Sequence, residues 1–281
     1  MSAATQAERA EELRRLHHAT DPLLLVNAWD AATAGILQSL GFPVVATTSA
    51  GIANARGYAD GERIGLHKML EAVARIVRSV QIPVTADLEA AYGKDIEDAR
   101  NTAWGAIEAG AVGLNIEDGS HQPGEGLVDI TLQASRIHAM RDVADERGVP
   151  LVINARTDAF WHDLAQDREQ RLQWTLERAR HYVDAGADSI FVPGVTDAAT
   201  IAALVKGINA PINILATSNT PTVAELGALG VRRISLGSRP FAFAMASFRK
   251  AALEVRDRGT YHFADECIPY SELNALFPDR V

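Results

Sequence analysis

Two kinds of segment alternate along this chain, and this alternation most limits how it can fold. Short apolar runs rich in β-branched residues, bounded by Gly, Pro or Asp, predict buried strands at 23–29, 44–49, 84–90, 113–118, 151–158, 189–194, 212–216 and 233–237. Longer Ala-rich segments with helical spacing of their apolar residues predict amphipathic helices at 64–80, 95–109, 131–147, 168–185, 197–206 and 222–229.

This order predicts an α/β fold with a parallel sheet. Consecutive strands joined by crossover helices pair in parallel. Eight such units close into a (β/α)₈ TIM-type barrel without leaving a sheet edge. The alternative is a doubly wound open sheet, which is disfavoured because no Gly-x-Gly-x-x-Gly follows the first strand.

We expect one domain over residues 1–281, since no linker or low-complexity stretch interrupts the pattern. Residues 1–20 predict an N-terminal helix, and residues 23–256 form the barrel. The tail, 257–281, is less regular, with a loop at 261–270 and a short helix at 271–277. Its apolar residues predict packing on the barrel or on a neighbouring subunit.

Composition excludes several classes of protein. The chain has 27 basic and 36 acidic residues, a net charge of −9, which argues against binding to nucleic acid or to an anionic membrane. A single cysteine, Cys267, permits neither an intrachain disulfide nor a Cys-rich metal site. No apolar run has membrane-spanning length, and residues 1–20 lack the apolar core of a secretory signal. We therefore expect a cytoplasmic protein.

Acidic residues occur late in the predicted strands, where the barrel fold places its chemistry. Asp87 and Glu89 share one face of their strand because side chains alternate. The next strand ends in Glu117 and Asp118. Neighbouring carboxylates in a barrel mouth need a cation or a proton, and oxygen ligands suit Mg²⁺ or Mn²⁺.

Residues 154–158 and 47–51 add groups that can bind an anion. Arg156 suits a substrate carboxylate, or a structural salt bridge to Glu117 or Asp158, and both roles can coexist. The small residues at 47–51 let backbone N–H groups approach a ligand oxygen, although a tight turn explains them equally. The following segment, 52–63, can cover the mouth and supply Asp60.

Absent residue types narrow the chemistry. None of the four lysines lies in a predicted strand, which disfavours a Schiff-base aldolase, and no zinc-binding His motif is present. His121, past the fourth strand, reaches the mouth or lies on a surface loop. The remaining set suits a metal chelated by a 2-oxo acid, whose enolate the site would stabilise.

Seven motifs in order together resemble the isocitrate lyase/phosphoenolpyruvate mutase superfamily over about residues 20–250. They are Asn27-Ala-Trp-Asp30, Thr47-Thr-Ser-Ala-Gly51, Gly57-Tyr-Ala-Asp60-Gly, Ala86-Asp-Leu-Glu-Ala-Ala-Tyr-Gly93, Ile116-Glu-Asp118, Ala155-Arg-Thr-Asp-Ala and Gly186-Ala-Asp-Ser-Ile-Phe-Val-Pro193. The resemblance implies a (β/α)₈ barrel whose last helix is exchanged between subunits of a homotetramer, a dimer of dimers. It also implies Mg²⁺ and a small anionic 2-oxo or dicarboxylic acid that reacts through a pyruvate-type enolate.

The resemblance also implies roles for individual residues. Asp87 would bind the metal directly, and Asp60, Glu89 and Glu117 would hold metal-bound waters. Arg156, with Asp60 and Glu117, would act in catalysis. Further substrate contacts would come from Ser49, Ala50, Gly51, Trp29 and Asn213, and His121 is added as a candidate from its position after the fourth strand.

One departure from the family bears on the reaction. Lyases that cleave isocitrate or 2-methylisocitrate carry a Lys-x-Cys-Gly-His loop after the fourth strand, whereas residues 119–127 contain neither Lys nor Cys. Our leading hypothesis is therefore a Mg²⁺-dependent lyase that cleaves a C–C bond of a small 2-oxo or 2-hydroxy dicarboxylate, with decarboxylation as one form. The alternatives are a P–C phosphonomutase or phosphonopyruvate hydrolase, and a catalytically silent metabolite-binding barrel. Segments 52–63, 119–128 and 213–222 are expected to select the substrate.

Overall fold

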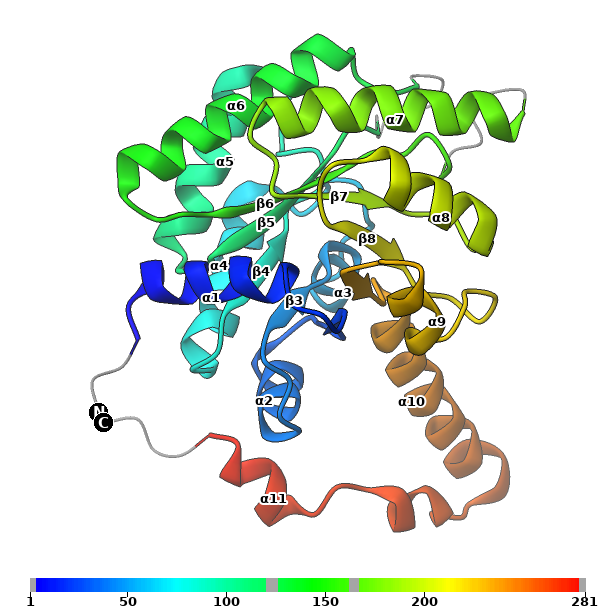
Figure 1. Ribbon diagram of the computed structural model, residues 1–281. Helices are drawn as coiled ribbons and strands as arrows, with labels where there is room; N and C mark the ends of the chain where they lie inside the picture. Colours follow the sequence, from blue (N-terminus) through cyan, green and yellow to red (C-terminus); the bar gives the residue numbers. More distant parts are fainter. Residues whose placement is uncertain (1–3, 120–125, 162–166, 278–281) are drawn as a thin grey trace.

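The structure, a computed structural model, describes residues 4–119, 126–161 and 167–277. Within these residues, nine parallel strands form one sheet in the order β1-β9-β8-β7-β6-β5-β4-β3-β2, with helices around it (Figure 1). This confirms the predicted barrel class. The strands are β1 (Leu23–Leu25), β2 (Asn27–Ala28), β3 (Val45–Thr47), β4 (Val84–Asp87), β5 (Gly113–Glu117), β6 (Val152–Arg156), β7 (Ser189–Val192), β8 (Ile212–Leu215) and β9 (Arg233–Ser235).

The barrel closes at the first predicted strand, which the structure divides at Val26. β1 pairs with β9 and β2 pairs with β3, so one short stretch of chain joins both ends of the sheet. The Asn27 side chain links the two sides. Its amide donates to the Thr47 carbonyl (2.8 Å), and its Oδ1 accepts from the N–H groups of Leu236 (3.0 Å) and Gly237 (2.8 Å).

Helices connect and cover the strands, and several begin at a side-chain cap such as Asp30, Asp167 or Thr222. The sequence pattern does not predict α2, α3 or α10, and it treats 52–55 and 261–270 as loop, although the latter contains a 3₁₀ helix at 262–266. Residues 52–55 belong to the helix α3, whose first turn is capped by the Thr48 side chain. The helices are α1 (Gln6–His17), α2 (Ala31–Ser39), α3 (Ser49–Ala55), α4 (Leu66–Ser79), α5 (Ile96–Glu108), α6 (Ile130–Arg147), α7 (Arg168–Asp184), α8 (Ala198–Gly207), α9 (Val223–Ala228), α10 (Arg239–Arg258), the 3₁₀ helix η1 (His262–Glu266) and α11 (Tyr270–Ala275).

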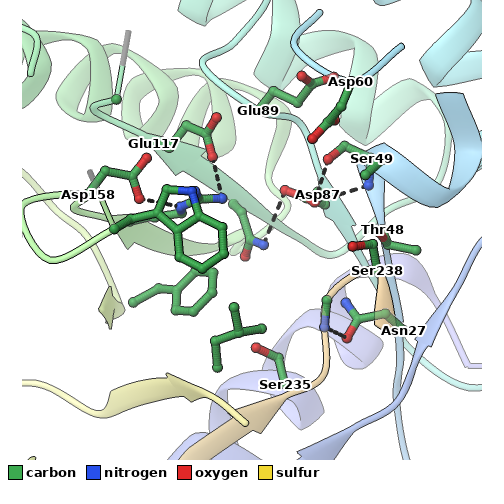
Figure 2. Close-up of a pocket in the computed structure, with 18 of the residues that line it drawn as sticks. Asn27, Thr48, Ser49, Asp60, Asp87, Glu89, Glu117, Asp158, Ser235 and Ser238 are labelled. Carbon is green, nitrogen blue, oxygen red and sulfur yellow. Dashed lines mark hydrogen bonds and ion pairs between the residues drawn. The ribbon is translucent and has the colours of Figure 1, made fainter. Parts of the chain in front are cut away.

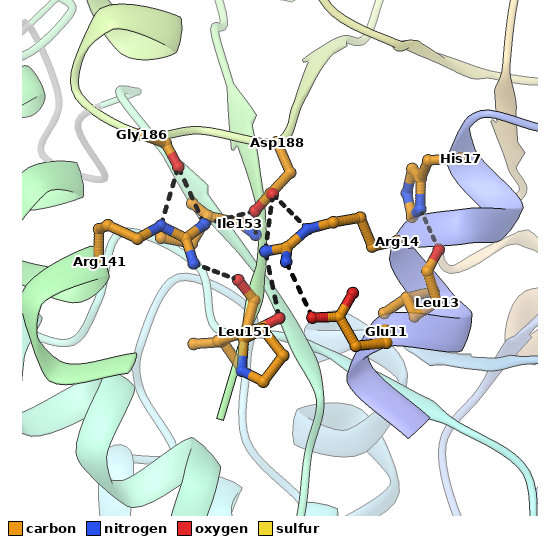
Figure 3. Close-up of polar contacts among 10 residues, drawn as sticks. Glu11, Leu13, Arg14, His17, Arg141, Leu151, Ile153, Gly186 and Asp188 are labelled. Carbon is orange, nitrogen blue, oxygen red and sulfur yellow. Dashed lines mark hydrogen bonds and ion pairs between the residues drawn. The ribbon is translucent and has the colours of Figure 1, made fainter. Parts of the chain in front are cut away.

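α1 packs on the barrel near the ends where the strands begin. Figure 3 shows Arg14 of α1 and Arg141 of α6 pointing at the carboxylate of Asp188. Arg14 Nε donates to Asp188 Oδ1 (3.1 Å), and Arg141 Nη2 donates to Asp188 Oδ2 (2.5 Å). Arg14 also donates to the Pro150 carbonyl (3.3 Å), and Leu13 is fully buried. These contacts place the last turn of α1 beneath the barrel interior.

α10 leaves the barrel and leads to a tail with little burial (Figure 1). Within α10 only Phe241 is buried, whereas Phe243 is 76% and Phe248 is 72% exposed. The tail returns past η1 to α2, where Leu276 lies against Gly35. No helix of the described residues is both long and apolar enough to span a membrane.

The closure contacts make a stability prediction. Asn27→Ala removes the side-chain partner of the Gly237 N–H and of the Thr47 carbonyl, while the Leu236 N–H keeps its bond to the Leu25 carbonyl (3.3 Å), so we expect the free energy of unfolding in urea to fall by about 1–3 kcal/mol. Asn54→Ala, which removes an exposed hydrogen bond to the Tyr58 carbonyl, should cost less than about 0.5 kcal/mol. Equal losses in the two variants would contradict the role given to Asn27.

Candidate active site

A cavity of about 370 Å³ opens at the carboxyl ends of the strands (Figure 2). Most residues selected from the sequence line it: Ser49, Ala50, Asp60, Asp87, Glu89, Glu117 and Arg156. Asp158 and Asn115 also line it, as do Asn27 and Phe191 from the sequence motifs. Four further lining residues are not singled out by the sequence: Arg63, Trp161, Ser235 and Ser238.

Asp87, at the end of β4, is held on both carboxylate oxygens. Its Oδ2 accepts from the Ser49 N–H (3.0 Å) and the Ser49 hydroxyl (2.7 Å), and its Oδ1 accepts a long bond from the Asn115 amide (3.4 Å). Its backbone N–H donates to Thr47 Oγ1 (2.9 Å). These donors fix the orientation of the carboxylate at the floor of the cavity.

A run of amides in the barrel interior supports this contact. Ser189 donates to Asn154 Oδ1 (2.6 Å), Asn154 donates to Asn115 Oδ1 (2.8 Å), and Asn115 donates in turn to Asp87. All donors point the same way, so each bond polarises the next. Because Asn115 Oδ1 receives two donors, its amide nitrogen must face Asp87.

The second of those donors is Arg233 of β9, whose Nη2 lies 3.2 Å from Asn115 Oδ1. Burial lowers the pKa of Arg233 to about 9, which still leaves it charged at neutral pH. His17 of α1 lies behind it, with Nε2 3.2 Å from Arg233 Nη1. Since His17 Nδ1 must donate to the Leu13 carbonyl (2.7 Å), Nε2 is the acceptor, and burial keeps His17 neutral by lowering its pKa to about 3.

The prediction that Glu89 lies in the same strand as Asp87 is wrong: β4 ends at Asp87, and Glu89 lies in the turn that follows, where it joins two loops at the side of the cavity. Its Oε2 accepts from the Glu62 N–H (2.6 Å) and its Oε1 from the Tyr92 hydroxyl (2.8 Å), while Glu62 Oε1 accepts from the Tyr92 N–H (2.5 Å). Four residues here have a positive φ of 51° to 70°, a backbone conformation that is strained for residues other than glycine: Glu62, Glu89, Ala91 and Tyr92. Burial raises the pKa of Glu89 to about 7.

Arg156, at the end of β6, lies between two carboxylates. Its Nη1 is 2.6 Å from Glu117 Oε2 and its Nε is 2.6 Å from Asp158 Oδ1. Burial opposes its charge, but these carboxylates outweigh that effect and hold its pKa above the ordinary value. Burial also raises the pKa of Asp158 to about 7. The rings of Trp161 and Phe191 each lie 5.7 Å from the guanidinium carbon.

Other residues selected from the sequence have different surroundings. Trp29 packs edge-on against Phe241 (5.3 Å between ring centroids) and does not line the cavity. Asn213 is fully buried and accepts from Ser235 Oγ (3.2 Å). Asp118 accepts from Tyr182 and Arg178 on α7. His121 lies outside the described residues.

The expected oxyanion segment is partly used within the protein. The Ser49 N–H donates to Asp87, and the Gly51 N–H donates to Thr48 Oγ1 (3.3 Å). Ala50 is the second residue of α3, a position where a helix leaves its N–H without an intrahelical partner. A Cβ on Gly51 would come within 2.6 Å of Thr48 Cγ2, so this close packing needs glycine.

The donor set fits a hard divalent cation bound largely through water. Within residues 4–119, 126–161 and 167–277, no three His, Cys, Asp or Glu side chains converge closely enough to hold an ion together. Mg²⁺ characteristically takes one or two carboxylates and retains several waters. Asp87 at the cavity floor, with Asp60, Glu89 and Glu117 around the same cavity, matches that pattern.

The fold and this acidic cavity define a barrel enzyme with its chemistry at the strand ends, and comparison with known proteins identifies its family. The phosphoenolpyruvate phosphomutase family model matches residues 13–256. An uncharacterized protein of Mycobacterium tuberculosis (strain ATCC 25618 / H37Rv) is 35% identical over 264 residues, 94% of this chain and 95% of its own. The chain therefore belongs to this family, within the isocitrate lyase/phosphoenolpyruvate mutase superfamily, as its motifs predict.

Solved structures agree with this assignment. A structure from Burkholderia cenocepacia J2315, described provisionally as a lyase/mutase, has a TM-score of 0.90 at 36% identity and covers 98% of this chain and 97% of its own. Oxaloacetate acetylhydrolase in complex with the product oxalate has a TM-score of 0.85 at 25% identity, covering 95% and 93%. The homologues whose names state an activity are lyases, mutases or hydrolases that act on small organic acids, in a superfamily that generally depends on divalent metals.

The raised pKa of Glu89 predicts a pH-dependent stability. A carboxyl whose pKa is raised on folding destabilises the fold only when it ionises, so this cost is absent below about pH 4.5 and complete above about pH 7. We would measure urea unfolding of metal-free protein at pH 5 and at pH 8. The stability advantage of Glu89→Gln over the wild type should be larger at pH 8 than at pH 5, by on the order of 1–3 kcal/mol. The exposed Glu97→Gln is the control. A difference between Glu89→Gln and wild type that is the same at both pH values would contradict the assignment.

Proposed function

We propose that this enzyme is a Mg²⁺-dependent lyase that cleaves a C–C bond of a small 2-oxo or 2-hydroxy dicarboxylate through a pyruvate-type enolate. The observation that carries the proposal is the fixed Asp87 carboxylate facing the same cavity as the clamped Arg156 guanidinium. The described lining residues include neither Lys nor Cys, so nothing among them provides a covalent nucleophile of the Schiff-base or thiolate type. Decarboxylation is one concrete form of this reaction.

Asp87 would hold the metal directly, with Asp60, Glu89 and Glu117 bound to it through water, and Mn²⁺ would substitute for Mg²⁺. When bound, the cation supplies Lewis-acid stabilisation of negative charge on the substrate oxygen. Arg156 would orient a substrate carboxylate with the N–H groups that Glu117 and Asp158 leave available. The Ala50 N–H would donate to a second substrate oxygen, and Trp161 with Phe191 would limit access of water.

P–C chemistry is the alternative, because the matching family model is that of phosphoenolpyruvate phosphomutase. The same carboxylates, Arg156 and Ala50 would serve a phosphonopyruvate-type substrate. Without Cys or Lys in residues 119–127, the loop acid that cleaves isocitrate or 2-methylisocitrate is missing from this sequence. We therefore rank those two substrates lower.

A substrate panel tests the reaction class. The enzyme with Mg²⁺ should convert one of oxaloacetate, alkylmalates, 2-methylisocitrate or phosphonopyruvate to a pyruvate-type product, followed by proton and phosphorus NMR. Asp87→Ala or EDTA should lower the rate by at least about 100-fold, since the metal's charge stabilisation is lost. Asp142→Ala, on the outer face of α6, should leave it unchanged. Full activity of Asp87→Ala would contradict the mechanism, and ligand binding without turnover of any compound would favour the silent barrel.

We also propose that the protein is a cytoplasmic homotetramer, a dimer of dimers, in which α10 and the tail pack on a neighbouring subunit. Support comes from the exposed Phe243 and Phe248 on α10, since exposed aromatic faces of this kind mark interaction sites.

The assembly can be tested without an activity assay. Phe243→Glu with Phe248→Glu should convert the assembly to smaller species in sedimentation velocity, because charges then replace the apolar contact. Lys206→Glu, an exposed position on α8 and outside α10 and the tail, is the control for added charge. A wild-type monomer would overturn this proposal.

A further inference from the structure

Two arginines line the cavity, and they differ in what binds them. Arg156 is held by Glu117 and Asp158, both at 2.6 Å, so its charge is already matched by two carboxylates. Arg63 also lines the cavity and is exposed, and the described part of the chain gives its guanidinium no hydrogen bond or ion pair. Arg63 is therefore the arginine at this cavity whose charge no carboxylate of the described residues already offsets.

The backbone that carries Arg63 is held in place, although its side chain is not. Arg63 follows Glu62 in the connection between α3 and α4. Glu62 is fixed through its N–H to Glu89 (2.6 Å), through its carboxylate to the Tyr92 N–H (2.5 Å), and through its carbonyl to the Gly65 N–H (3.1 Å). The guanidinium is thus presented from a fixed point on the rim, which lowers the entropy lost when an anion binds.

The cavity is lined by carboxylates, so an anionic substrate needs a cation such as Arg63 to bind there. Asp60, Asp87, Glu89, Glu117 and Asp158 all line it. A metal ion at Asp87 and the clamped Arg156 offset part of this charge near the floor. A substrate with two anionic groups would still place its outer group among carboxylates at the rim, which is unfavourable unless a cation is close by.

We propose that Arg63 is the specificity-determining residue for the outer carboxylate of a 2-oxo or 2-hydroxy dicarboxylate, the one remote from the reacting centre. This inference rests on the proposed function, which places the inner carboxylate and carbonyl near Asp87 and Ala50. A guanidinium can bind a carboxylate through two parallel N–H bonds, whereas a lysine offers one point charge. The enzyme then selects dicarboxylates over the corresponding monocarboxylic 2-oxo acids.

Two non-reacting probes separate the inner and outer contacts. Oxalate mimics a pyruvate enolate and has no outer carboxylate beyond it, whereas 3,3-difluorooxaloacetate has one. Their dissociation constants with the Mg²⁺-loaded full-length protein would be measured by calorimetry for wild type, Arg63→Gln and Arg63→Lys. Arg56→Gln is the matched control, since Arg56 lies in the same connection but pairs with Glu71 away from the cavity (3.6 Å).

Arg63→Gln should weaken difluorooxaloacetate about 10-fold or more and oxalate less than about 2-fold, with Arg63→Lys in between and Arg56→Gln unchanged. Equal weakening of both probes would show that Arg63 only attracts anions in general, and would overturn the inference. An unchanged affinity for difluorooxaloacetate would overturn it too, while the proposed function stands. If neither probe binds the wild-type protein, the proposed function fails and the inference fails with it.

Discussion

The site depends on one electrostatic constraint: among the described residues, five carboxylates face a single cavity, and each needs a cation, a proton or a hydrogen-bond donor nearby. The contacts of the described residues meet this need in three ways for four of these groups. Asp87 receives donors from Ser49 and Asn115, whereas Glu117 and Asp158 share Arg156. Glu89, with its pKa raised to about 7, binds the Glu62 N–H and Tyr92.

The constraint extends through the barrel interior to its opposite end. Arg233 is wholly buried and donates to Asn115, which donates to Asp87, while His17 of α1 accepts from Arg233 on the other side. An N-terminal helix that packs beneath the strands is thereby linked to the carboxylate on the cavity floor. Burying a guanidinium is costly without partners, so the polar interior and the acidic mouth support each other.

The sequence predicts the barrel and the acidic face because both follow from periodicity. Asp87 and Arg156 are found by their places late in two strands, whereas strand alternation does not explain Glu89, because β4 ends at Asp87 and Glu89 lies in the following turn with a φ of 51°. The supports of Asp87 are not readable in this way: Asn115, Asn154 and Arg233 meet only after distant strands pair. Trp29 belongs to a recognisable motif, but its side chain packs on Phe241. Arg63 could not be predicted as a cavity residue from periodicity, because a loop places it at the rim.

The central claim is that a divalent cation binds at Asp87 in this cavity. The most direct measurement is anomalous X-ray diffraction from crystals of the wild-type protein and of Asp87→Ala, both soaked in Mn²⁺. The account predicts one strong anomalous peak within direct bonding distance of an Asp87 oxygen, about 2.0–2.2 Å, and its loss in the variant. A peak that persists in Asp87→Ala, or a wild-type ion bound elsewhere in the molecule, would contradict the account.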